Sequence, residues 1–223
     1  IEDCAHALGT KYKNKHVGNF GVTGNFSFYP TKQLTTGEGG AVITNDLNFY
    51  KKIKKLKAFG IDKDIMDRKK QGDYDVKDLG FNYRMTDFQA SMGYQQIKKY
   101  KNNLKIRKKI AKRYIKNLIK SDNIIFEPYS SDNSYFIFQL FCIRRDFVLK
   151  RFKELGIGVS VHYSTPVNQM SYYKNKYKIN QKDYKNSNLY SKMNISLPVY
   201  PKLKNIEIDF ICKTLIKLTK NDK

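Results

Sequence analysis

The pattern of apolar and polar positions divides the chain into a region of strands and turns followed by alternating helices and strands. Residues 1–45 hold short apolar segments separated by glycine-rich turns, which is typical of an α/β sheet. The segment LNFYKKIKKLKAFG, which follows Asp46, has apolar residues at helical spacing and predicts a surface helix that stops at Gly60. Residues 61–79, in contrast, are polar, charged and aperiodic.

A much longer helix is predicted from Met85 to about Lys120, where helical periodicity persists over many turns. Thr86 is the candidate N-cap, because a hydroxyl there can accept a backbone N–H of the first turn. We expect this helix to bridge two domains, residues 1–105 and residues 106–223.

The remainder of the chain predicts a second, smaller α/β layer. SYFIFQLFCI is an aromatic and β-branched run typical of a buried strand, and FVLKRFKEL predicts a short amphipathic helix that ends at Gly156. GVSVHY predicts a further strand, and SLPVYPKL an extended, proline-punctuated segment. A final amphipathic helix is expected from about Ile206 to Leu218.

Length and composition indicate a folded protein that lies in the cytoplasm. The chain has 223 residues, of which 40% are hydrophobic, so it can bury a substantial core. No run approaches the roughly 18 apolar residues of a membrane span, and no secretory signal is visible. Cys4, Cys142 and Cys212 are too scattered for a disulfide framework or a CxxC metal site, so we expect buried free thiols and no metal.

The formal net charge of +23 is compatible with nucleic acid, an anionic membrane surface or anionic small substrates as partners. Lysine is spread through almost every segment together with Asn, Ile and Tyr, which favours a general compositional preference over a basic stripe. No RNP-like motif, zinc-finger spacing or KH loop accompanies the charge. We therefore expect neither nucleic acid nor membrane as a partner, and keep a basic binding module as the alternative.

The chemistry of the chain is concentrated in FSFYPTKQLTTGEGGAV, where Lys32 stands in a turn between an apolar strand and a glycine-rich loop. An amine nucleophile needs a confined site that aligns it with a carbonyl, and a turn braced by Pro30 and Gly37 can provide one. Most lysines of so basic a chain are solvated surface residues, and it is this setting that distinguishes Lys32.

Three motifs, IEDCAHALG, FSFYPTKQLTTGEGGAV and LGFNYRMTDFQASMGYQQIKK, resemble the sugar aminotransferase family of DegT/DnrJ type. They stand in the order of that family and at roughly its spacing, and the resemblance covers essentially the whole chain. It implies pyridoxal-phosphate-dependent enzymes of fold type I, with this chain forming the C-terminal part of the large domain and a small α/β domain. Because the chain opens at Ile1, within a motif, we expect an upstream portion that carries a phosphate-binding loop.

The resemblance implies a role for several residues of the first half. Lys32 matches the lysine that bears the cofactor. Asp3 matches the carboxylate that keeps the pyridine nitrogen of pyridoxal phosphate protonated. His6 matches a position packed near the cofactor ring, and Ser27 a hydroxyl that contacts the phosphate. Taken singly, Asp3, His6 and Ser27 would each be an ordinary structural residue.

The segment GFNYRMTD contains two further candidate residues, Asn82 and Arg84. Asn82 matches the asparagine that reaches the cofactor phosphate of the neighbouring subunit, so the resemblance implies an active site shared between two subunits. Arg84 is a candidate substrate-binding residue or a brace for the turn. Without the resemblance, a polar side chain at a junction of loop and helix is most often a cap.

In the last third, GVSVHYSTPVNQMSYYK resembles the segment of the family that approaches the sugar nucleotide. His162 and Tyr163 are the candidate substrate-binding residues. The pattern looks closest to the subgroup that aminates UDP-linked 4-keto-6-deoxy-N-acetylhexosamines on the route to pseudaminic acid. The competing interpretation places Tyr163, Tyr172 and Tyr173 in an aromatic core strand.

The reaction that the resemblance implies is the transfer of an amine from glutamate to a nucleotide-linked keto-sugar, in the biosynthesis of surface polysaccharide or glycan. Lys32 would also move the proton between the reacting carbons. Dehydration of the sugar is disfavoured, because the dehydratase branch of the family replaces this lysine. A truncated, non-catalytic fragment remains the alternative of a different class.

Overall fold

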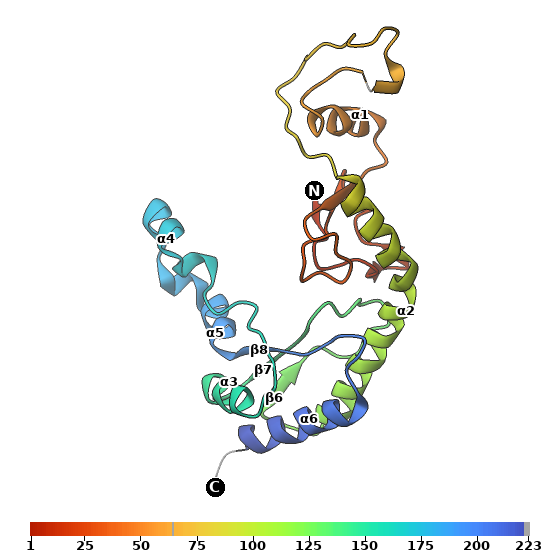
Figure 1. Ribbon diagram of the computed structural model, residues 1–223. Helices are drawn as coiled ribbons and strands as arrows, with labels where there is room; N and C mark the ends of the chain where they lie inside the picture. The colour runs from red at the N-terminus through yellow and green to blue at the C-terminus, as the bar shows by residue number, and fades with distance from the viewer. Residues whose placement is uncertain (64, 221–223) are drawn as a thin grey trace. The chain divides into compact units, whose positions relative to one another are not determined.

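The computed structural model describes residues 1–63 and 65–220 and divides into two compact units. The first unit consists of Ile1–Asn102 with Asp132–Ser134. The second consists of Asn103–Ser131 and the described part of Tyr135–Lys223. The helix α2 (Asp87–Leu118) contributes its first half to one unit and its second half to the other (Figure 1).

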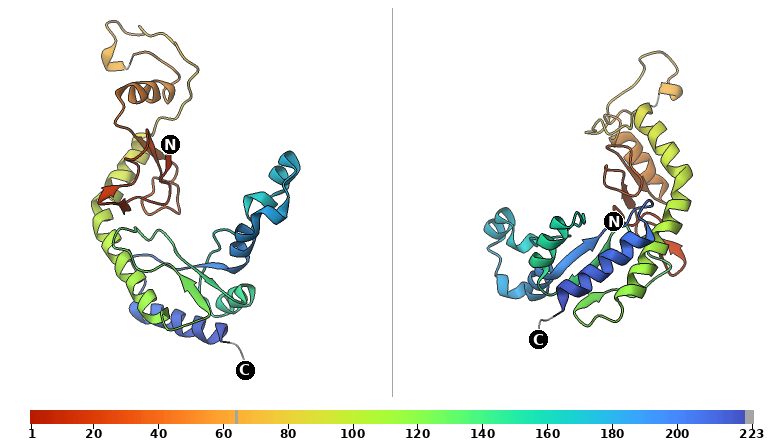
Figure 2. Two further views of the ribbon diagram at one scale, coloured as in Figure 1. Left: turned by 180° about the vertical axis from the view of Figure 1, so that it is seen from behind. Right: turned by 60° about the horizontal axis from the view of Figure 1, so that its bottom comes forward.

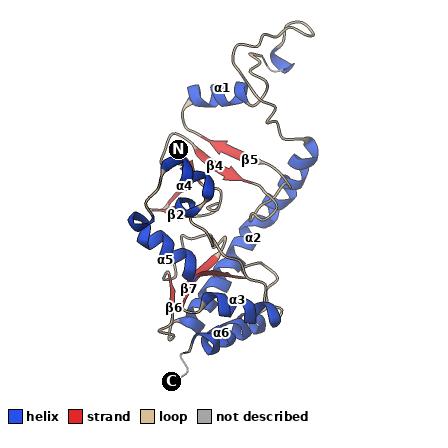
Figure 3. Cartoon of the chain, turned by 90° about the vertical axis from the view of Figure 1, so that its left-hand side faces the viewer, coloured by secondary structure: helices blue, strands red, loops and turns tan. Residues whose placement is uncertain are grey.

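The first unit is built on a three-stranded sheet in the order β1-β4-β5. Strand β1 (Glu2–Asp3) pairs in parallel with β4 (Gly24–Ser27), and β4 pairs antiparallel with β5 (Gly40–Ile43). In Figure 3, β4 and β5 lie side by side, and the chain continues from β5 into α1. A small antiparallel hairpin of β2 (Lys11–Tyr12) and β3 (Lys15–His16) stands between β1 and β4 in the sequence. The strand-and-turn pattern predicted for residues 1–45 is therefore present.

Helix α1 (Leu47–Leu56) begins as predicted but ends earlier. The Asp46 carboxylate accepts hydrogen bonds from the N–H groups of Asn48 and Phe49, at 2.8 and 3.1 Å, and so caps the helix. The predicted stop at Gly60 is wrong by about one turn. The reason is tertiary: Ala58 forms a β-bridge with Asn82, and this pairing draws the backbone out of the helix.

The segment between α1 and α2 contains one short 3-10 helix, η1 (Ile65–Asp67), among its described residues. The segment ends at Thr86, directly before α2. The hydroxyl of Thr86 accepts the N–H of Gln89 at 3.2 Å, and Gln89 Oε1 accepts the N–H of Thr86 at 2.9 Å. This reciprocal pair satisfies two backbone donors at the start of α2. The prediction of Thr86 as N-cap of the long helix is confirmed.

The second unit holds an antiparallel sheet in the order β6-β7-β8, formed by Ile124–Phe126, Phe138–Cys142 and Asn194–Leu197. The second half of α2, α3 (Arg145–Glu154) and α6 (Asn205–Thr219) pack around it (Figure 2). Together they enclose one core, whose most buried side chains include Tyr114, Leu118, Leu140, Val148, Phe152, Ile195, Ile208 and Leu215.

The two faces of β7 have different environments. Phe138, Leu140 and Cys142 are buried in the core, whereas Gln139 and Phe141 alternate with them and point to the other face of the sheet. The pairing with β8 places Gln139 opposite Ser196 and Phe141 opposite Asn194. The sheet therefore has a second face with polar side chains, opposite its apolar core.

The segment GVSVHY is not a strand, in contrast to the prediction. Only Ser160 pairs with the sheet, in an antiparallel bridge to Ser196. The chain then enters a helical stretch that the sequence pattern did not reveal, made of η2 (Val167–Gln169), α4 (Ser171–Tyr177), η3 (Gln181–Tyr184) and α5 (Lys185–Met193). These helices are short and largely exposed, so they carry little of the apolar periodicity on which prediction depends.

All three cysteines are buried free thiols, as expected. Burial raises the pKa of the Cys142 thiol to about 11 and that of the Cys212 thiol to about 12. Across the described part of the chain, none of the helices is both long enough and apolar enough to cross a membrane.

Candidate functional site

The residues that match the cofactor motifs stand at one edge of the first unit's sheet. The parallel register places Asp3 of β1 beside Asn25 of β4. Because the carboxyl ends of parallel strands meet at the same edge, the segment after Asp3 and the segment after Ser27 both leave the sheet there. His6 follows β1 in a turn closed by the Ala7 N–H and the Cys4 carbonyl at 2.9 Å. Lys32 follows β4.

Lys32 lies in a loop whose two ends are joined by backbone hydrogen bonds. The N–H of Phe28 donates to the Gly39 carbonyl at 2.8 Å, and the N–H of Thr36 donates to the Phe28 carbonyl at 3.0 Å. Inside the loop, the N–H of Lys32 itself donates to the Tyr29 carbonyl at 2.9 Å, which closes a turn. The side chain of Lys32 is half-buried. This lysine therefore stands in a defined turn, as the sequence motif predicts.

The neighbours of Lys32 anchor this turn to the rest of the unit. Gln33 donates from Nε2 to the Ser134 carbonyl at 2.8 Å and accepts from the hydroxyl of Tyr100 at 3.1 Å. Leu34 is buried. With anchors directly after it, the backbone at Lys32 has little freedom to move.

Asp3 and Ser27 each make a local contact that orients the side chain. The Asp3 carboxylate accepts the N–H of Ala5 at 3.0 Å and is otherwise exposed. The hydroxyl of Ser27 accepts the N–H of Tyr29 at 3.3 Å. An exposed carboxylate at a strand end and a hydroxyl at the end of the next strand are both available for a ligand.

Glu2, at the opposite end of the same strand β1, is a residue to which sequence analysis gave no role. Its carboxylate accepts the backbone N–H groups of Gly18, Phe20 and Gly21 at 2.8, 2.7 and 2.6 Å. These bonds, that of Gly21 first, hold the pKa of Glu2 below its usual value. Glu2 therefore ties the loop before β4 to β1. Its contacts come from residues 16 to 19 positions away, and no local signal could have indicated them.

Asn82 and Arg84 belong to the segment after α1 rather than to the strand ends. They contact each other, with Arg84 Nε donating to Asn82 Oδ1 at 3.3 Å, and both are exposed. The guanidinium of Arg84 also lies over the ring of Phe59, 4.9 Å from its centroid. Both interactions hold the pair in place at the surface of the unit.

His162 and Tyr163 belong to the second unit and lie on the polar face of its sheet. His162 Nδ1 and Ser196 Oγ are 2.9 Å apart, and the His162 carbonyl accepts from Gln139 Nε2 at 2.7 Å. The interpretation of Tyr163, Tyr172 and Tyr173 as aromatic side chains of a core strand is wrong. Tyr163 is 62% exposed, and the other two are exposed residues of α4.

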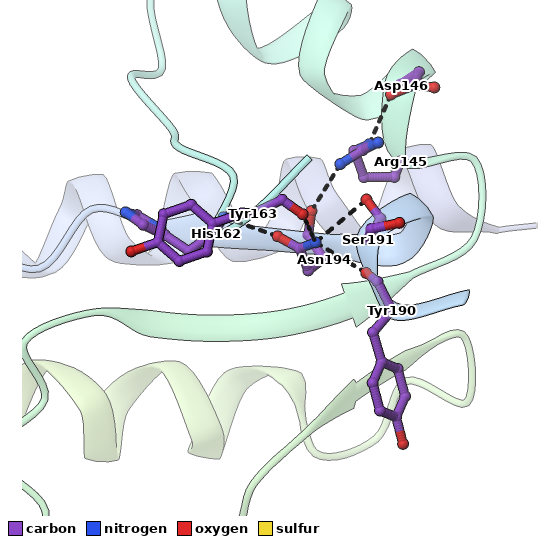
Figure 4. Close-up of polar contacts among 7 residues, drawn as sticks. All are labelled: Arg145, Asp146, His162, Tyr163, Tyr190, Ser191 and Asn194. Carbon is purple, nitrogen blue, oxygen red and sulfur yellow. Dashed lines mark hydrogen bonds and ion pairs between the residues drawn. The ribbon is translucent and has the colours of Figure 1, made fainter. Parts of the chain in front are cut away.

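Asn194 is a second residue that sequence analysis missed. It is 2% exposed and contacts both His162 and Tyr163 through its side-chain amide (Figure 4). The sequence NISLPVY shows an asparagine before an apolar strand, which is an ordinary place for one. Only the pairing of β8 with the segment around Ser160 brings it to His162.

Comparison with known proteins identifies the family of this fold. The sequence profile of the DegT/DnrJ/EryC1/StrS aminotransferase family matches residues 1–216. A UDP-4-amino-4,6-dideoxy-N-acetyl-beta-L-altrosamine transaminase of Campylobacter jejuni is 32% identical over 230 residues, which cover 100% of this chain and 59% of that protein.

Solved structures of aminotransferases are also similar to this chain. Helicobacter pylori PseC, an aminotransferase involved in the biosynthesis of pseudoaminic acid, superposes with a TM-score of 0.88 at 27% identity, covering 97% of this chain and 58% of the other. A putative sugar aminotransferase of Streptococcus pneumoniae in its PMP form gives a TM-score of 0.89 at 27% identity, with the same two coverages. The same protein is known in a PLP form.

The chain thus spans about three fifths of the length of the curated relatives that it matches. The expected α/β fold of the type I aminotransferases is confirmed by these neighbours, whereas the division of the chain at residue 105 remains a prediction. From the profile match and the structural similarity together, the chain belongs to the DegT/DnrJ/EryC1/StrS aminotransferase family.

Proposed function

We propose that this chain is the catalytic-lysine-bearing part of a pyridoxal-phosphate-dependent aminotransferase that moves an amine from glutamate to a nucleotide-linked keto-sugar. The observation that carries the proposal is the edge of the first unit's sheet. There, the parallel register of β1 and β4 gathers the carboxylate of Asp3, the hydroxyl of Ser27 and the loop of Lys32. The proposed sugar is a UDP-linked 4-keto-6-deoxy-N-acetylhexosamine, the substrate class that we expected from the sequence.

The residues at this edge fit pyridoxal phosphate by their chemistry. A primary amine in a fixed turn can bond to an aldehyde, a carboxylate can pair with a protonated pyridine nitrogen, and a hydroxyl can donate to a phosphate oxygen. Lys32, Asp3 and Ser27 supply these three groups from two adjacent strand ends. The role proposed for His6, in the turn after β1, is to pack near the ring. When bound, the cofactor supplies an electron sink for the carbanion that forms at the donor carbon.

The side chains of this chain divide the remaining work. Asp3 holds a proton on the pyridine nitrogen through its negative charge. Lys32 Nζ accepts the α-proton of glutamate and later donates a proton to the carbon of the sugar that receives the amine. The backbone bonds on either side of Lys32 keep this amine in place while the proton moves.

Asn82, Arg84, His162 and Tyr163 are proposed to serve binding rather than proton transfer. Asn82 contacts the cofactor phosphate of a neighbouring subunit, so the working enzyme is a homodimer. Arg84 offers a permanent positive charge to an anionic substrate. His162 and Tyr163 contact the sugar nucleotide. The exposure of Tyr163 and the surface position of Asn82 and Arg84 support binding roles.

The test is cofactor attachment at Lys32. Because the chain spans about three fifths of its relatives, we would use both this chain and a version completed at its N-terminus with the corresponding part of the Campylobacter jejuni relative. Each is incubated with pyridoxal phosphate, and its absorbance spectrum is recorded. Borohydride reduction and peptide mapping then locate the label. We expect a visible absorbance band in the completed version and the label on Lys32.

Lys32→Arg keeps the positive charge but should abolish both band and label, whereas the control Lys13→Arg, at an exposed lysine of the same unit, should leave them intact. A completed protein without any band would refute the aminotransferase proposal. Salt-dependent retention of that protein on heparin would then favour the basic binding module.

A further inference from the structure

The polar face of the second unit's sheet holds a buried side chain that neither the family motifs nor the proposed mechanism uses. Asn194 is the first residue of β8 and is 2% exposed. It shares its face of the sheet with Gln139 and Ser196, because Gln139 pairs with Ser196 and Phe141 with Asn194. Buried carboxamides are retained only where their hydrogen bonds are made.

The carboxamide of Asn194 joins both ends of the dipeptide His162–Tyr163. Its Oδ1 accepts the N–H of His162 at 2.9 Å, and its Nδ2 donates to the carbonyl of Tyr163 at 3.1 Å. Figure 4 shows Asn194 between this dipeptide and the end of α5. One side chain thereby fixes the entry and the exit of the backbone around the two candidate substrate residues.

The same Nδ2 also ties this turn to α5 and β8. It donates to the carbonyls of Tyr190 and Ser191, at 2.9 and 3.3 Å, in the last turn of the helix. The carbonyl of Tyr190 also accepts the backbone N–H of Asn194, so Asn194 caps α5 through both its backbone and its side chain. The backbone carbonyl of Asn194 accepts from the buried guanidinium of Arg145 at 3.3 Å. Asn194 is therefore held by the sheet, the helix and α3.

The rings of the dipeptide are placed by this backbone support. His162 Nδ1 lies 2.9 Å from Ser196 Oγ, and Gln139 Nε2 donates to the His162 carbonyl at 2.7 Å. The two rings meet edge to face, with centroids 5.3 Å apart, and Tyr163 remains 62% exposed. The dipeptide is thus fixed from its buried side and presents an aromatic surface outward.

We propose that Asn194 is a positioning residue for the sugar nucleotide, which sets the backbone path of His162 and Tyr163 and through it the affinity for that substrate. This inference rests on the proposed function, in which these two residues contact the sugar nucleotide. An amide meets this need, because its two Nδ2 protons are shared among the carbonyls of Tyr163, Tyr190 and Ser191 while its oxygen accepts the N–H of His162. The substitution Asn194→Asp keeps the size of the side chain but turns an oxygen toward those carbonyls.

The test compares Asn194→Asp with Asn123→Asp in the N-terminally completed enzyme loaded with pyridoxal phosphate. Asn123 is a matched control because it is a half-buried residue of the second unit, and its Nδ2 likewise donates to a backbone carbonyl, that of Thr219, at 2.8 Å. The half-reaction with glutamate and the half-reaction with UDP-4-keto-6-deoxy-N-acetylhexosamine are measured separately by cofactor absorbance.

For Asn194→Asp we expect KM for the sugar nucleotide to rise about tenfold or more, since a buried donor becomes an acceptor. The glutamate half-reaction and the label on Lys32 should be unchanged. Asn123→Asp should change KM for the sugar nucleotide by no more than about twofold. If Asn194→Asp prevents folding, Ser196→Ala carries the test, because it removes only the hydroxyl beside His162 and should raise the same KM in the same direction.

Two outcomes would overturn the inference: an unchanged KM for the sugar nucleotide in the folded variant, or an equal loss in both half-reactions, which is what a general structural role produces. Lack of either half-reaction in the unsubstituted enzyme would refute the proposed function instead. The glutamate half-reaction therefore separates the two failures.

Discussion

Arg113 and Asp209 form a bidentate ion pair that links α2 to α6 in the second unit. Nε of Arg113 lies 2.8 Å from Oδ1 of Asp209, and Nη2 lies 2.5 Å from Oδ2. Asn117 adds a third bond to Oδ1, at 2.7 Å. The fork of Arg113 and the amide of Asn117 lower the pKa of Asp209 from 3.8 to about 2.

This ion pair predicts a pH dependence of stability. The pKa of Asp209 is lowered in the folded state, so its contribution is complete above the unfolded value near 3.8 and is lost as pH falls toward about 2. Asp209→Asn should remove this dependence, which urea midpoints between pH 4 and pH 2 would reveal. Asp122→Asn, at an exposed aspartate of the same unit, is the control. Equal pH profiles for Asp209→Asn and the parent would contradict the prediction.

In the second unit, replacing isoleucine with alanine should lower the free energy of unfolding much more at a buried position than at an exposed one. Ile195 in β8 is 0% exposed, whereas Ile125 in β6 is 62% exposed. Ile195→Ala leaves a cavity and should lower the free energy of unfolding by about 2–5 kcal/mol. Ile125→Ala should cost about 1 kcal/mol or less. Denaturant titration followed by far-UV circular dichroism measures both, and similar losses would show that the core is not where we place it.

The segment that carries Asn82 depends on a close approach of two glycines. A Cβ on Gly80 would lie 2.0 Å from the backbone nitrogen of Gly60, so Gly80→Ala must displace backbone. We expect faster amide hydrogen exchange at Phe81 and Tyr83, whose N–H groups bond to the carbonyls of Leu56 and Lys57.

Gly158→Ala is the matched control for this glycine, because a Cβ there would meet open space. It should leave the exchange of the Phe81 and Tyr83 amides as in the parent. Unchanged exchange of these amides in Gly80→Ala would show that the segment tolerates a side chain at residue 80. The close approach of Gly60 and Gly80 would then not be needed to keep the segment in place.

The carboxylate of Glu2 predicts an effect on three amides of the loop before β4. Glu2→Gln replaces one acceptor oxygen with a donor, so either the Gly18 bond or the Phe20 and Gly21 bonds must break. Hydrogen exchange at these amides should accelerate. Glu38→Gln, at an exposed residue of the same unit, should have no such effect. In the parent, protection should weaken at acidic pH, because the lowered pKa of Glu2 means that its bonds are lost as pH falls through that value.

The sequence alone determined the features that depend on neighbouring residues. The caps at Asp46 and Thr86 follow from side chains that bond to the next few backbone N–H groups, and the structure forms both. The periodicity that predicted the long helix and the buried run around Phe138 depends only on spacing along the chain. The turn at Lys32 is likewise local, since its backbone bond joins residues 29 and 32.

The tertiary structure decided what depends on residues far apart in the chain. Helix α1 ends at Leu56 because Ala58 pairs with Asn82, and the segment around Ser160 makes a single bridge because only Ser196 is opposite it. Asn194 reaches His162 across 32 residues for the same reason. Pairing of distant backbones is a choice among many possible registers, and local preference carries no information about which register the whole chain will favour.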